Sequence, residues 1–135
     1  MDFLNKFSGI AHWLPRASLA ATFLYHGVTK FAGAEMMAQM MGVPVVAVYL
    51  LVLMEVGGAL LILWGGFGPD WATRVSGLLF SVVMLGAIVM VHGKNGWNSI
   101  NMGPDMPGQG MEFQVLILAT ALYFAFKGNS ANAAA

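Results

Sequence analysis

The sequence predicts an all-α integral membrane protein, a bundle of four transmembrane helices preceded by an amphipathic segment at the membrane interface. Composition is the first reason: of 135 residues, 59% are hydrophobic and 9% are charged, whereas soluble domains carry about 25% charged residues. The second reason is a set of apolar segments, each close to the roughly 17–25 residues that cross a bilayer core as a helix. These predicted spans are residues 14–31, 45–64, 75–91 and 113–126.

Ahead of the first span, apolar side chains recur at helical spacing with polar ones between them. Phe3, Phe7, Ile10 and Leu14 form this apolar stripe, which is typical of a helix lying in the membrane interface. The first span itself carries three basic side chains and has no convincing cleavage site. We therefore expect it to be retained as a helix rather than removed as a signal peptide.

The connections between the spans are short, and composition reveals no internal repeat and no domain boundary. The methionine-rich residues 35–41 are expected to form a second interfacial turn or to re-enter the membrane partly. Residues 65–73 are expected to form a tight turn rich in Gly and Pro, and residues 92–110 a longer irregular loop. We interpret residues 1–135 as one domain.

The positions of the basic residues predict the orientation in the inner, cytoplasmic membrane. The side shared by both termini carries more Lys and Arg than the other side, and cytoplasmic loops are enriched in these residues. Both termini are therefore expected in the cytoplasm, and the 92–110 loop outside. The basic residues on the cytoplasmic side are Lys6, Arg16, Arg74 and Lys127, against Lys30 and Lys94 outside.

Several ionisable residues lie within or at the ends of the predicted spans. Such groups cost at least about 2.5–3.5 kcal/mol each at the bilayer centre, so they normally face the bundle interior or a wet cavity. Three of them, Arg16, His26 and Lys30, lie on the first span. At about 100° per residue, their side chains fall within an arc of roughly 80° around the helix axis. Because consecutive spans alternate in direction, four of the ionisable groups are expected to meet near the outer surface. These four are His26, Lys30, His92 and Glu112, with Glu55 about 15 Å deeper and Arg16 near the opposite surface.

These residues and their order resemble the DoxX family. The most specific part is the first-span pattern of Arg16, His26-Gly27 and Lys30-Phe31. It is followed by Glu55 with the Gly57-Gly58 pair, by Ser76-Gly77 through Met84 and Ala87 to His92, and by Glu112. The resemblance covers nearly the whole chain and implies a membrane protein of four helices. One branch of the family, DoxD, is a subunit of a thiosulfate:quinone oxidoreductase, which implies a redox function.

We therefore predict a quinone-binding site near the outer surface. His26 and Lys30, together with His92, are expected to contact the quinone, because donors stabilise the charge that develops on a carbonyl oxygen during reduction. Glu55 and Glu112 are expected to act catalytically as proton carriers. Arg16 is expected to be a structural anchor that reaches the interface and pairs with a lipid phosphate. The lipid bilayer, a peripheral or membrane redox subunit and a second copy of the chain are the expected partners.

Other interpretations of the same residues remain open. Buried charges can instead form a structural ion pair, and the chain can then be a non-catalytic membrane helper or anchoring subunit for a partner protein. His26 and His92 are poor evidence for haem, and we expect none. A Cu(I) site would need the methionines at positions 36, 37, 40, 41, 102 and 106, which also serve as apolar filler, and we expect no metal. The absence of cysteine argues against iron–sulfur clusters, and the absence of a basic run argues against nucleic acid.

Overall fold

The computed structural model describes residues 2–101, 103–104 and 108–132, and these residues form helices and connecting loops without a β-strand. The all-α prediction is thus confirmed. The elements are α1 (Asp2–Asn5), η1 (Ser8–Ile10), α2 (Trp13–Ala32), α3 (Ala34–Met41), α4 (Val45–Gly65), α5 (Asp70–Ala87), η2 (Ile88–His92), η3 (Gly93–Asn95), α6 (Glu112–Lys127) and η4 (Gly128–Asn132). The segment η2 is a π-helix that continues α5, and η1, η3 and η4 are 3-10 helices.

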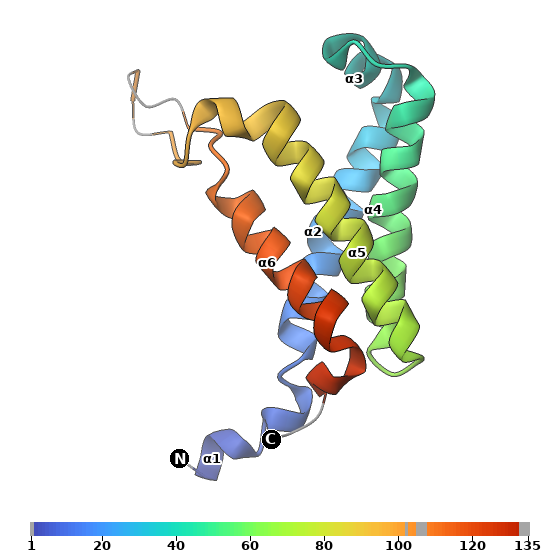
Figure 1. Ribbon diagram of the computed structural model, residues 1–135, viewed down its shortest axis with the longest axis vertical. Coiled ribbons are helices and arrows are strands. Elements are labelled where there is room, and N and C mark those ends of the chain that lie inside the picture. Colours follow the sequence, from blue (N-terminus) through green and yellow to red (C-terminus); the bar gives the residue numbers. More distant parts are fainter. Residues whose placement is uncertain (1, 102, 105–107, 133–135) are drawn as a thin grey trace.

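Four long helices form the body of the protein in a chain of neighbours (Figure 1). Helix α2 packs along α4, α4 packs against α5, and α5 packs against α6, whereas α2 and α6 touch only marginally. The α2–α4 pair and the α5–α6 pair therefore diverge toward the end that carries α3 (Figure 1). Helix α1 and the C-terminal end of α6 lie together at the opposite end.

Two helical segments in the described chain are long and apolar enough to cross a membrane. They are Val45–Gly65, with 21 residues, and Asp70–Asn95, with 26 residues. Their outward surfaces are apolar, and so are those of α2 and α6: for example, Leu53 is 67% exposed and Leu116 is 64% exposed. Large exposed apolar surfaces of this kind are rare on soluble monomers and typical of membrane contact.

The core lies where the four long helices meet. Phe23 of α2 stacks on Phe80 of α5, with ring centroids 3.8 Å apart, and both side chains are buried. Ile62 of α4 and Phe124 of α6 complete this cluster. Aromatic stacking adds about 0.5–1.5 kcal/mol to the area that such rings bury, so this layer holds the two diverging helix pairs together.

The N-terminal segment differs from the predicted continuous amphipathic helix. It breaks into α1 and η1 before α2 begins at Trp13, with the Ser8 hydroxyl donating to the Asn5 carbonyl at the break. Serine favours such local bonds over helix continuation. The apolar side chains of the predicted stripe are nevertheless exposed, as Phe3 and Leu14 illustrate.

The predicted connections agree in outline with the structure. The methionine-rich segment forms a short helix, α3, in which Met36 and Met40 are exposed. Met102 and Met106, two of the methionines that a Cu(I) site would need, lie outside the described residues. The loop after η3 is irregular, as predicted, and its two ends are joined by backbone hydrogen bonds such as that from Gly110 N to Asn98 O.

Candidate functional site in the helix bundle

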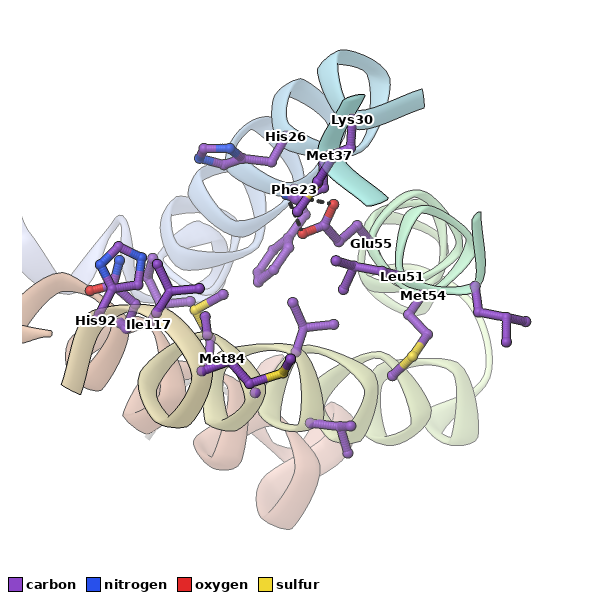
Figure 2. Close-up of a pocket in the computed structure, with 18 of the residues that line it drawn as sticks. Phe23, His26, Lys30, Met37, Leu51, Met54, Glu55, Met84, His92 and Ile117 are labelled. Atoms are coloured by element: carbon purple, nitrogen blue, oxygen red, sulfur yellow. Dashed lines mark hydrogen bonds and ion pairs between the residues drawn. The ribbon is translucent and has the colours of Figure 1, made fainter. Parts of the chain in front are cut away.

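A cavity of about 480 Å³ lies between the α2–α4 pair and the α5–α6 pair (Figure 2). Ligand pockets in proteins commonly range from about 300 to 1,000 Å³. Most of its lining is apolar, and some lining side chains, including Leu50 and Met90, are also exposed at the surface, so the cavity is open to the outside. The polar or charged side chains in the lining belong to Thr22, His26, Lys30, Glu55, His92 and Gln114.

Lys30 and Glu55 form an ion pair on the α2–α4 side of the cavity (Figure 2). The Lys30 ammonium lies 2.8 Å from Glu55 Oε1 and 3.1 Å from Oε2, so it donates to both carboxylate oxygens. The Glu55 side chain is 3% exposed, and the Lys30 side chain is 20% exposed. The pair therefore neutralises a buried carboxylate while leaving the ammonium partly accessible from the cavity.

A glycine on α2 allows this pair to form. A Cβ atom on Gly27 would lie 2.6 Å from Val56 Cγ2 and 3.5 Å from Glu55 Cβ, which is too close for any residue larger than glycine without movement. Helix α2 thus approaches α4 at the level of Glu55. In the predicted Gly57-Gly58 pair, a Cβ atom on Gly58 would meet the Phe80 ring, whereas one on Gly57 would have no neighbour within 4 Å. Of the two, only Gly58 therefore allows a neighbouring helix to approach closely.

Two histidines line the cavity on different elements. His26 extends from α2, one helical turn before Lys30, and is exposed. His92 ends the π-helix η2 and lies across the cavity from the Lys30–Glu55 pair (Figure 2). Its Nδ1 atom lies 2.8 Å from the carbonyl oxygen of Gln109. A π-helical turn carries more residues per turn than an α-helix and recurs at functional sites.

Glu112 is not part of this cavity. It begins α6, as predicted, but its Oε1 atom accepts a hydrogen bond of 3.0 Å from the Ser99 backbone N–H. The carboxylate thus binds the loop that precedes α6. His26, Lys30 and His92 line one cavity, as predicted, while Glu112 lies outside the cavity lining. The predicted depth of Glu55, about 15 Å beyond this group, is wrong, because Glu55 pairs directly with Lys30.

Arg16 differs from its predicted setting at the lipid surface. Its side chain is 0% exposed and lies inside the opposite end of the bundle, so it does not reach a lipid phosphate. The guanidinium donates to the Ile62 carbonyl at 2.8 Å and to Thr73 Oγ1 at 3.0 Å, and it lies 4.7 Å above the Phe124 ring. It also donates to His12 Nδ1, Asn129 Oδ1 and Asn132 Oδ1. Arg16 is therefore an anchor between helices rather than to the membrane.

The protonation state of His12 supports this network. His12 precedes α2, and burial together with the positive charge of Arg16 lowers its pKa below the ordinary value. The lowered pKa favours the neutral ring, in which Nδ1 can accept the hydrogen bond of 3.2 Å from Arg16 Nε.

Several residues of the cavity and of the Arg16 hydrogen-bond network were not identified from the sequence. Gln114 is an uncharged polar residue inside the fourth predicted span, and the search for ionisable groups that singled out Glu55 passed over it. Asn129 and Asn132 follow α6, where nothing in the local sequence indicates contact with Arg16. Met37 and Met84 line the cavity with other methionines, and such flexible side chains allow an apolar pocket to adapt to its ligand.

The fold and the cavity define a class of protein: a helical, membrane-associated protein whose interior holds an ion pair at an apolar pocket. The DoxX family pattern matches residues 6–93. The chain is also 31% identical over 129 residues to the Bacillus subtilis (strain 168) protein named "Putative oxidoreductase CatD", and the match covers 93% of this chain and 85% of that relative. The chain belongs to the DoxX family. No solved structure matches it.

Proposed function

We propose that the chain is a quinone-binding subunit of a membrane redox system. The observation that carries the proposal is the Lys30–Glu55 ion pair at the wall of an apolar cavity of about 480 Å³. A quinone needs an apolar slot for its ring and tail, and a donor at a carbonyl oxygen. The cavity offers both. Membership of the DoxX family and the oxidoreductase name of the B. subtilis relative support a redox association.

Each polar residue of the α2–α4 side has a definite role in this proposal. The Lys30 ammonium has three N–H donors, and in the described residues it donates to one carboxylate only. It can therefore donate a further hydrogen bond to a carbonyl oxygen of the ligand. His26 supplies a second donor on the same helix. Glu55 holds the Lys30 ammonium in place and can exchange a proton with that ammonium. When bound, a quinone supplies a carrier of two electrons and two protons.

The membrane arrangement is part of the proposal. We place all four long helices across the inner, cytoplasmic membrane, with both termini in the cytoplasm. The exposed apolar surfaces of α2 and α6 support two further spans besides α4 and the segment that begins with α5. The cavity would then be reached from the lipid, where quinones dissolve. A peripheral or membrane redox subunit would supply the electrons. It would do so alone or together with a second copy of the chain.

A non-catalytic helper function is the second candidate, and one observation favours it. Lys30 and Glu55 already neutralise each other, so the pair needs no ligand in order to explain its presence. In that case the cavity would bind lipid tails, and the charged residues would only fix the packing of α2 on α4. The two candidates differ in whether the cavity binds a quinone in a manner that depends on Lys30.

The deciding experiment is binding of a short-chain quinone analogue to the purified protein, with any copurifying partner retained. We expect Lys30→Met and His26→Ala each to weaken binding about tenfold, the value of one lost hydrogen bond of about 1.4 kcal/mol. Lys94→Met is the matched control, because Lys94 is an exposed lysine outside the cavity. The proposal is wrong if the wild type binds no quinone, or if both cavity variants bind it as tightly as the wild type does.

A further inference from the structure

The cavity has hydrogen-bonding side chains on two opposed sides. Lys30 and Glu55 lie on the side formed by α2 and α4, while His92 and Gln114 come from η2 and α6. Figure 2 shows His92 beside Ile117, across the cavity from the Lys30–Glu55 pair. The proposed function uses the first side. Among the described residues, the second side also presents polar atoms without a partner, and these atoms differ in chemistry from the Lys30 ammonium.

The loop before α6 sets the tautomer of His92. A carbonyl oxygen can only accept a hydrogen bond, so the contact of 2.8 Å to Gln109 requires a proton on His92 Nδ1. The Gln109 carbonyl also accepts from Asn95 Nδ2 at 3.2 Å. Gln109 has a φ of 63°, a left-handed conformation that is uncommon for residues other than glycine. Because Nδ1 carries the proton, Nε2 of the neutral His92 imidazole is an acceptor.

Gln114 contributes a second acceptor. Its Oε1 atom is buried and has no hydrogen-bond partner in the described part of the chain, although buried polar atoms are normally bonded. Gln114 lines the cavity, so a rotation of its side-chain amide would bring Oε1 to a donor on a bound ligand. An unbonded buried carbonyl destabilises the free protein, and a donor on the ligand would remove that cost.

These two acceptors distinguish ligands by their hydroxyl groups. A quinone carries carbonyl oxygens, which cannot donate, whereas the corresponding quinol carries two O–H groups. We propose that His92 and Gln114 act as acceptors for the hydroxyl groups of the ligand, each O–H donating one hydrogen bond, so that the cavity binds a quinol more tightly than the quinone. This inference rests on the proposed function and adds the redox state that the site prefers. Lys30, as a donor to oxygen, serves either form.

The test compares three ligands that share one ring skeleton: a short-chain hydroquinone kept reduced, the corresponding quinone, which matches it closely in shape, and the dimethyl ether, which lacks the O–H donors. Binding to the purified full chain is measured by calorimetry. We expect the hydroquinone to bind at least about tenfold more tightly than either of the others, as expected for one further hydrogen bond. Gln114→Leu and His92→Phe should remove this preference and leave quinone affinity within about twofold. Gln39→Leu, an exposed glutamine outside the cavity, should change nothing.

A measurement on the unmodified protein avoids any loss of folding in the variants. The chain has three histidines, so ¹⁵N-labelled imidazoles can be resolved by NMR. We expect His92 to be protonated on Nδ1 in the free protein, and its Nε2 resonance to shift with the hydroquinone but not with the ether. A proton on Nε2 in the neutral ring would overturn the inference.

The outcomes separate this inference from the proposed function. If no ligand binds, both are overturned. A second outcome combines three results: quinone and hydroquinone bind equally, Lys30→Met weakens the binding of both, and the His92 and Gln114 variants have no effect. In that case the proposed function stands and the inference is wrong.

Discussion

Arg16 and Lys30 lie on the same helix, yet their charges are stabilised in different ways. Lys30 is paired with a carboxylate, whereas Arg16 is surrounded by neutral acceptors, and no ion pair to it occurs among the described residues. A guanidinium suits the second setting, because its five N–H donors lie in a fixed plane that can bond several acceptors at once. Lysine would not.

The Lys30–Glu55 pair should show strong coupling in stability. Lys30→Met leaves the buried Glu55 carboxylate without a partner, and Glu55→Gln leaves the ammonium without one, so each change should cost about 3–5 kcal/mol. The double variant should lose less than the sum of the two losses. Thermal unfolding in detergent measures all three. Lys30→Met combined with Glu112→Gln is the control, and its losses should add. Additive losses for Lys30 and Glu55 would contradict an energetically coupled ion pair.

Replacing Arg16 by lysine should be costly although it retains the charge. The ammonium cannot reach the Ile62 carbonyl, Thr73 and the asparagines of η4 together, so at least two charged hydrogen bonds would be lost, for about 3 kcal/mol or more. Arg74→Lys provides the comparison, because Arg74 is partly exposed and water can replace its bonds. Equal loss of stability for the two variants would show that burial does not determine the cost.

At the scale of the elements, glycine positions determine how closely the helices approach. A Cβ atom on Gly77 of α5 would lie 2.5 Å from Ala125 N and 2.6 Å from Ala121 O, and these backbone atoms of α6 cannot move independently. Gly77→Ala should therefore push α6 away and lower stability by about 1–3 kcal/mol. Gly57→Ala on α4, where a Cβ meets nothing within 4 Å, should raise stability by about 0.5–1 kcal/mol. Denaturation of both variants checks the opposite signs.

The sequence predicted the long helices well because their signal is local. Residues 45–64 and α4 (Val45–Gly65) agree almost to the residue, since an apolar run bounded by Pro44 and a glycine turn leaves little choice. The π-helical turn at η2 and the break after α1 were not predicted. Both depend on a few hydrogen bonds whose partners are not identified by periodicity.

The candidate site was predicted only in part, for a related reason. The chemistry of Lys30 and Glu55 can be recognised in a sequence, because charge inside a span has a high cost. Their pairing through Gly27, the burial of Arg16 against η4 and the separate position of Glu112 all depend on three-dimensional packing. Gln114 carries no charge, and its significance appears only because its carbonyl lacks a partner among the described residues.

At the scale of the whole molecule, the cavity results from the open packing of the four long helices. Helices α2 and α6 begin and end the series of contacts and meet only marginally, so the bundle does not close around its axis (Figure 1). The cavity residues His26 and Gln114 come from these two helices.

The orientation of this bundle can be tested because the sequence contains no cysteine. Single cysteines at Ile100, which is 58% exposed in the loop after η3, and at Ser130, which is exposed in η4, report on opposite ends. The excess of Lys and Arg at the end with the termini should keep that end in the cytoplasm. A membrane-impermeant maleimide should then label Ile100→Cys in intact cells, and Ser130→Cys only after the cells are opened. Labelling at position 130 but not at position 100 in intact cells would reverse the orientation and place the cavity entrance nearer the cytoplasm.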